Sequence, residues 1–224
     1  LDMKAAQIRR LLDQALIKGG QVDAQGNPDY VFEGIRRSPL EFGYRNKMEF
    51  SFGDAEKDGP LTLGLHKKGS TYDVLNAVDC RLVHEDMTRI LRCVLDYCRK
   101  EGFPYYHKMS HEGFLRHLLL RRAHATGEIL VNLVTTSQLE PDLSPLTEAL
   151  RALELEGKIV GILHIINDSL ADTVKSDESR ILYGKDYFYE ELLGLRFKVT
   201  PFSFFQPNTL GAEVLYRTVR EYIG

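Results

Sequence analysis

The residues best suited to chemistry lie near the end of the chain, in the segment Pro201-Phe202-Ser203-Phe204-Phe205-Gln206-Pro207-Asn208. The amide of Gln206 can both donate and accept hydrogen bonds with a polar ligand, and the ring of Phe204 can stack on a nucleobase. The segment lies between a strand-like run, 195–199, and a helix-like run, 210–223. On residue types alone, a buried aromatic cluster with a solvated glutamine is the commoner arrangement.

The junction between these two runs has its own sequence signals. Pro207 cannot donate a backbone hydrogen bond and therefore ends the strand. Asn208 or Thr209 can then cap the following helix. The first N–H groups of a helix lack intrahelical partners, so a ligand held here would meet them.

A first group of cations lies on the predicted strand 44–53. Alternation places Arg45, Lys47, Glu49 and Ser51 on one face of this strand and its apolar residues on the other. A solvated strand face explains such a pattern without any function. By this pattern alone, the solvated face is the favoured interpretation.

A second basic group lies on the strongest hairpin signal in the chain, in which runs 115–122 and 128–135 flank a turn that contains Gly127. The hairpin carries Arg116, Arg121 and Arg122. A salt-bridged hairpin and a phosphate-binding surface account for these arginines equally well.

The remaining runs are assigned from their periodicity. His164 lies within the apolar run 159–166 and is interpreted as a hydrogen-bonded core histidine rather than a metal ligand. Together the runs predict an α+β fold with a mainly antiparallel sheet and flanking helices. Helices are predicted over 3–17, 85–100, 141–153 and 210–223, and strands over 44–53, 61–66, 71–74, 115–122, 128–135, 159–166, 181–184, 187–192 and 195–199.

Composition narrows the class of protein. The chain has 224 residues, 43% of them hydrophobic, and a formal net charge of −3, so it is not basic overall although a local basic face remains compatible. Its three cysteines form no paired disulfide framework, which favours a reducing compartment. No apolar run reaches transmembrane length, and the first residues do not form a signal peptide. We therefore expect a cytoplasmic protein without a membrane partner.

Several segments, in order along the chain, resemble one known family. The segment Phe204 to Asn208 is similar to the F-F-Q-x-N signature of the S-adenosylmethionine-dependent RNA uracil-C5 methyltransferases, which form 5-methyluridine in transfer and ribosomal RNA. Residues 44–49 (Tyr-Arg-Asn-Lys-Met-Glu) and 64–69 resemble the central-domain signature of the same family. The basic hairpin and the segment 184–190 also resemble it.

The resemblance implies roles for individual residues. Gln206 would contact S-adenosylmethionine, and Phe204 would lie against the target base. Arg45 and Lys47 would bind RNA. The same is expected of the hairpin arginines Arg116, Arg121 and Arg122. The partner is thus expected to be ribosomal or transfer RNA.

Other features of the family are incomplete in this sequence. Some members hold a four-iron, four-sulfur cluster, and Cys80 resembles the fourth ligand of that cluster, whereas the other three ligands are missing. The family's nucleophilic cysteine and glutamate base are expected beyond residue 224. We therefore expect residues 1–200 to be a central RNA-recognition domain and 201–224 to begin a truncated, doubly wound catalytic domain. The alternative is a free-standing RNA-binding module without catalysis.

Overall fold

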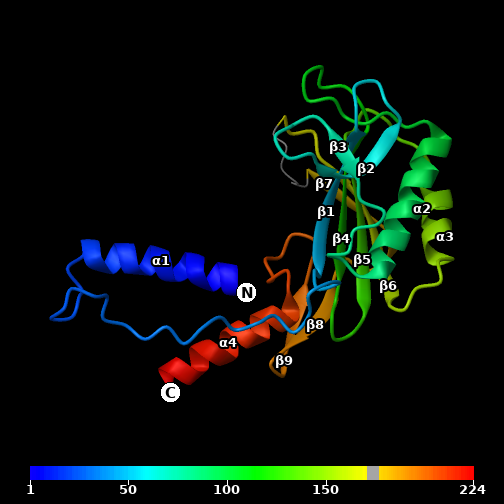
Figure 1. Ribbon diagram of the computed structural model, residues 1–224. Helices are drawn as coiled ribbons and strands as arrows, with labels where there is room; N and C mark the ends of the chain where they lie inside the picture. Colours follow the sequence, from blue (N-terminus) through cyan, green and yellow to red (C-terminus); the bar gives the residue numbers. More distant parts are fainter. Residues whose placement is uncertain (171–176) are drawn as a thin grey trace. The chain divides into compact units, whose positions relative to one another are not determined.

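The computed structural model describes residues 1–170 and 177–224 (Figure 1). None of the helices in these ranges has the length and apolarity needed to span a membrane. The chain divides into two compact units, one formed by 1–38 with 214–224 and the other by 39–213. The domain boundary expected at residue 200 stays a prediction.

The larger unit is built on a seven-stranded sheet with the strand order β3-β2-β1-β4-β5-β6-β7. Neighbouring strands are antiparallel except for β5 and β6, which are parallel, so the predicted mainly antiparallel sheet is confirmed. The strands are β1 (Lys47–Asp54), β2 (Leu61–His66), β3 (Val74–Asn76), β4 (Leu115–Arg122), β5 (Glu128–Thr135), β6 (Lys158–Ile166) and β7 (Glu178–Gly184).

Two helices, α2 (Glu85–Glu101) and α3 (Ser144–Arg151), cover one face of the sheet (Figure 1). In α2, apolar residues recur every three or four positions, so a single stripe of the helix is buried. The side chain of His84 caps its start by accepting a hydrogen bond from the backbone N–H of Asp86, and Gly102 ends it in the left-handed conformation. The main hydrophobic core lies between this stripe and the sheet.

The opposite face of the sheet is covered by a small second sheet, in which β8 (Phe188–Leu192) pairs with β9 (Leu195–Val199). Phe188 and Val199 from this hairpin form a second core cluster with residues of β5 and β6, and Phe205 packs against it. The central strands β4 and β5 are therefore buried on both faces.

The smaller unit contains α1 (Asp2–Lys18) and most of α4 (Thr209–Ile223). The predicted helix over 3–17 is confirmed, but none of its residues is buried. Within this unit, Arg36 forms an ion pair with Glu221 at 3.0 Å, and the hydroxyl of Tyr222 donates to Glu33.

Candidate functional site

The loop between β9 and α4 presents two very different side chains. The ring of Phe204 is 85% exposed, although large apolar rings normally pack against other residues. Its neighbour Phe205 is half-buried and contacts the ring of Phe197, with 5.7 Å between ring centroids. A buried aromatic cluster thus describes Phe205 and does not describe Phe204.

Gln206 is half-buried in the same loop, and no hydrogen bond of its side-chain amide is found within the described ranges. The predicted helix cap follows, because the side chain of Asn208 accepts a hydrogen bond from the backbone N–H of Gly211 at 2.8 Å. The amide of Gln206 thus lies next to a capped helix start and is available to a polar ligand.

Asn46 fixes the backbone of this loop to the start of β1. Its backbone N–H donates to the carbonyl of Pro207 at 2.8 Å, and its buried side-chain amide donates to the carbonyl of Gln206 at 2.8 Å. The same amide nitrogen lies 2.9 Å from the hydroxyl of Thr209, the first residue of α4. Sequence reasoning assigned Asn46 only to the apolar face of its strand and missed this role.

Glu190 holds the start of α4 from the other side. Its carboxylate is buried and accepts hydrogen bonds from the hydroxyl of Thr209 at 3.0 Å and from the backbone N–H groups of His124 and Ala125. It thus joins α4 to the turn between β4 and β5. Glu190 lies in the segment 184–190, which the sequence analysis singled out, but no local signal indicated that its side chain would be buried.

The three arginines of the hairpin are buried and contact other parts of the protein, so the RNA-binding role expected of them stays a prediction. Arg116 donates to the backbone carbonyls of Asn167 and Ser169, each at 2.7 Å. Arg121 donates to the carbonyl of Pro201 at 2.9 Å and to that of Ser203. The physical reason is the central position of β4, which is covered on both faces, so that little of these side chains reaches solvent.

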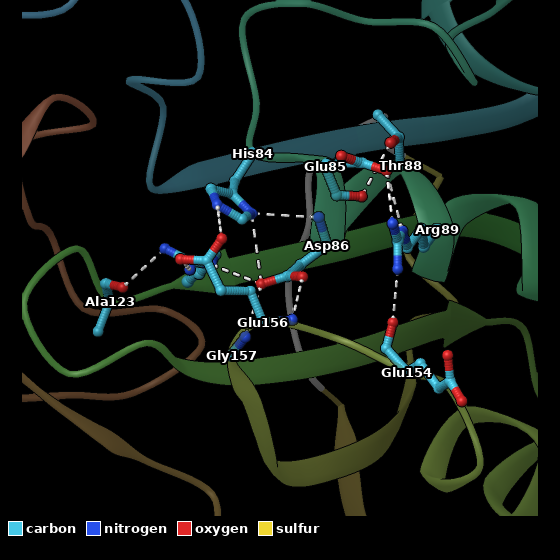
Figure 2. Close-up of polar contacts among 10 residues, drawn as sticks. His84, Glu85, Asp86, Thr88, Arg89, Ala123, Glu154, Glu156 and Gly157 are labelled. Atoms are coloured by element: carbon cyan, nitrogen blue, oxygen red, sulfur yellow. Dashed lines mark hydrogen bonds and ion pairs between the residues drawn. The ribbon is translucent and has the colours of Figure 1, made fainter.

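A polar network surrounds Asp86 at the start of α2 (Figure 2). Arg122 contributes to it through a hydrogen bond to Asp86. The carboxylate of Asp86 accepts from Arg122 and from the backbone N–H groups of Glu156 and Gly157, each at 2.9 Å, and it lies 3.3 Å from a ring nitrogen of His84. Burial raises the pKa of Asp86, but these hydrogen bonds outweigh burial and bring the pKa below its ordinary value. These contacts account for Arg122 as a structural residue.

Arg45 and Lys47 are half-buried. They flank Asn46, which holds the loop between β9 and α4. Within the described part of the chain, the buried Nε of Arg45 has no hydrogen-bond partner. Lys47 pairs in register with Arg121 on β4. Burial lowers the pKa of Lys47, and the nearby cations Arg121 and Arg45 lower it further, while Glu49 partly opposes them. Positive charge therefore accumulates next to the loop that carries Phe204.

A further group of cations lies on one face of the β8–β9 hairpin. Arg196 stacks over the ring of Tyr189 at 3.7 Å, and Lys198 lies 4.1 Å from the centroid of Tyr187. Lys185 lies 4.8 Å from the same ring of Tyr187. The sequence analysis missed Arg196 and Lys198, although their spacing of two along the strand 195–199 puts both on one face.

The cysteines offer no metal site. Cys80 is half-buried and packs against the main core, and in the described ranges no three His, Cys, Asp or Glu side chains are grouped so that they could hold a metal ion. Cluster ligation needs four thiolates or close substitutes, so these residues do not fit an iron–sulfur cluster. Burial raises the pKa of Cys98 to about 12 and also raises that of Cys93.

Comparison with known proteins identifies relatives of the whole chain. Over all 224 residues it is 47% identical to an uncharacterised RNA methyltransferase of Clostridium tetani and 46% identical to one of Clostridium acetobutylicum. Each match spans 47% of the relative, so the chain covers about half the length of these curated relatives. No protein-family model matches the chain.

A solved structure has a similar fold. The crystal structure of Pyrococcus abyssi tRNA (uracil-54, C5)-methyltransferase in complex with S-adenosyl-L-homocysteine matches with a TM-score of 0.64 and 26% identity. The match covers 82% of this chain and 42% of that one. The chain therefore belongs to the RNA methyltransferases. Its family within that class is the RNA uracil-C5 methyltransferases, as the sequence motifs indicated.

Proposed function

We propose that the intact protein transfers a methyl group from S-adenosylmethionine to C5 of uridine in RNA. The present chain would contribute RNA recognition and one edge of the site for donor and target base. The observation that carries this proposal is the ring of Phe204, which is 85% exposed on a loop whose backbone is fixed by Asn46 and Arg121. An exposed ring on a rigid loop is suited to stack on an unpaired base.

Gln206 would bind the donor. S-adenosylmethionine supplies a methyl group bonded to a sulfonium, together with polar groups that an amide can recognise by donating and accepting hydrogen bonds. The backbone carbonyl of Gln206 is held by Asn46 at 2.8 Å, so the loop is positioned before any ligand binds. This preorganisation reduces the ordering cost of binding.

RNA would bind to the cations that remain accessible. Arg45 and Lys47 keep their proposed role beside the loop, whereas the contacts of Arg116, Arg121 and Arg122 favour positioning over phosphate binding. The exposed side chains of Arg196 and Lys198 extend the basic surface. Transfer RNA is the first substrate to assay because the solved relative is a tRNA methyltransferase, and ribosomal RNA is the second.

The test distinguishes effects on donor binding from effects on RNA turnover, and it uses the intact protein. Gln206→Ala should weaken donor binding by about 1–3 kcal/mol, because polar groups of the donor lose their partner. Phe204→Ala should leave donor binding unchanged and reduce RNA turnover by an equivalent of about 1–3 kcal/mol, because a stacking partner is lost. Phe202→Ala is the matched control, since this ring lies on the same loop and is 46% exposed. Donor affinity is measured by calorimetric titration beside a melting curve for each variant. Equal losses of donor affinity in both site variants, in step with their melting temperatures, would contradict the proposal.

A further inference from the structure

A cavity of about 410 Å³ lies at the far end of β1 from the Gln206 loop. The strand starts at Lys47, next to Asn46, and ends at Asp54, which lines the cavity. At about 3.3 Å per residue, the two ends of β1 are about 23 Å apart. The cavity is therefore separate from the proposed donor and target-base site.

Aromatic side chains form a large part of the lining of this cavity. Tyr72, Tyr105, Tyr106 and His107 all contribute to it. The rings of Tyr105 and His107 lie with their centroids 4.2 Å apart, and Tyr72 is 57% exposed. Aromatic rings around an open cavity offer faces on which a flat heterocycle can stack.

The walls of the cavity are held by backbone contacts. The backbone N–H of Tyr106 donates to the carbonyl of Leu115 at 2.8 Å. Gly113 has φ +120°, and a Cβ there would lie 2.0 Å from the carbonyl oxygen of Tyr105, so only glycine permits this close approach. The ammonium of Lys108 donates to the carbonyl of Thr71 at 3.0 Å and joins two walls. The cavity is thus preformed.

The polar lining combines acceptors with cations. Asp54, Asp58 and Asp73 supply carboxylate oxygens, which accept hydrogen bonds from amino groups. Lys57 and Lys108 supply positive charge for a phosphate. Because uracil carries no exocyclic amino group, this lining fits adenine, cytosine or guanine better than uracil.

We propose that this cavity binds an unpaired, amino-bearing nucleobase of the RNA substrate, at the opposite end of β1 from the proposed target-base site. That this nucleobase belongs to an RNA chain rests on the proposed function. The cavity would add a second anchoring point for RNA, so that recognition depends on a nucleotide well away from the target base.

The test uses the intact protein with the Phe204→Ala substitution, so that stacking at the proposed target-base site is removed. The probe is 2-aminopurine riboside 5′-monophosphate, whose fluorescence falls when the base stacks on an aromatic ring. Tyr72→Ala should weaken binding of this probe about five- to a hundredfold, which corresponds to the loss of one stacking partner. Tyr72→Phe, which keeps the ring, should retain binding, and Tyr222→Ala serves as a control tyrosine outside the cavity.

Competition then defines the class of base. Adenosine and cytidine monophosphates should displace the probe at lower concentrations than uridine monophosphate. Unchanged quenching in Tyr72→Ala, or displacement by spermidine but not by nucleotides, would overturn the proposal. Equal displacement by uridine monophosphate would overturn the preference for amino-bearing bases. Methyl transfer is assayed separately with the unsubstituted protein, so a failure of the proposed function is distinguished from a failure of this inference.

Discussion

The side-chain amide of Asn46 donates to the backbone carbonyl of Gln206 across 2.8 Å, although 160 positions separate the two residues in the sequence. The same amide contacts the hydroxyl of Thr209, which in turn donates to the buried carboxylate of Glu190. This chain of hydrogen bonds connects the first strand of the sheet, the loop with Phe204 and the start of α4. The geometry of the loop therefore depends on a residue that would not itself touch a ligand.

Asn46→Ala should loosen this loop. Loss of the side-chain amide leaves the backbone carbonyl of Gln206 without its hydrogen-bond donor, and the free energy of unfolding should fall by about 1–3 kcal/mol. In the intact protein, donor affinity should fall as well, because the loop is no longer held in place. Urea unfolding and calorimetric titration measure the two effects. The exposed Asn76 provides the control substitution Asn76→Ala, and an equal effect of both variants would argue against a positioning role for Asn46.

Asp86→Asn should be strongly destabilising at neutral pH. Among the described residues, the substitution leaves the buried guanidinium of Arg122 with only the exposed carboxylate of Glu156 at 3.7 Å, and breaking a buried pair costs about 3–5 kcal/mol. Asp79→Asn is the matched control, because Asp79 pairs with Arg92 at 2.6 Å but is exposed, and such pairs contribute about 0–1 kcal/mol. Urea unfolding at pH 7 compares the two, and similar losses would contradict the importance of burial.

The same carboxylate predicts a dependence of stability on pH. The pKa of Asp86 is lowered in the folded protein, so its stabilising contribution is present above the unfolded pKa of about 3.9 and is lost as pH falls through the folded pKa. The difference in unfolding free energy between the unsubstituted protein and Asp86→Asn should therefore shrink when the pH is lowered from 5 to below the folded pKa. If the difference in unfolding free energy stays constant across this range, the charge of Asp86 does not contribute to stability.

The affinity for RNA should fall as the salt concentration rises, because exposed cations bind the phosphates. Removing two phosphate contacts with the double substitution Arg196→Gln and Lys198→Gln should reduce the slope of log affinity against log salt by about 0.7 for each contact on single-stranded RNA. The control double substitution is Lys68→Gln with Lys100→Gln, which changes the net charge equally at exposed positions elsewhere. Fluorescence anisotropy with a labelled RNA gives both slopes. If the two double variants have the same slope, net charge alone governs binding.

The isolated 224-residue chain should not methylate RNA. Uracil C5 becomes nucleophilic when a thiolate adds at C6, and no thiol of this chain is suited to that step. Cys98 is buried with its pKa raised to about 12, the pKa of Cys93 is also raised by burial, and Cys80 packs against the core. Transfer of a tritiated methyl group to unmodified RNA, with the intact protein as positive control, is the measurement. Incorporation above that of the heat-inactivated chain would contradict this expectation.

Local patterns in the sequence determined much of the fold. Alternation over 44–53 predicted β1 and its buried face, and the turn at Gly127 predicted the bounds of β4 and β5. Proline and asparagine signals also located the junction between the loop and α4. These features depend on backbone geometry and side-chain periodicity within a few residues, so a single sequence is enough to predict them.

Tertiary structure alone decided which of the basic residues are accessible. Arg121 and Arg196 both lie in predicted strands beside apolar residues, and the sequence analysis did not distinguish their exposure. Arg121 is buried because long-range pairing places β4 at the centre of the sheet under the loop 201–203, whereas Arg196 lies on the outer face of a hairpin that covers the core. The partners of Asn46 and Glu190 were decided in the same way, because a hydrogen bond between distant segments forms only when the packing of the whole sheet brings them together.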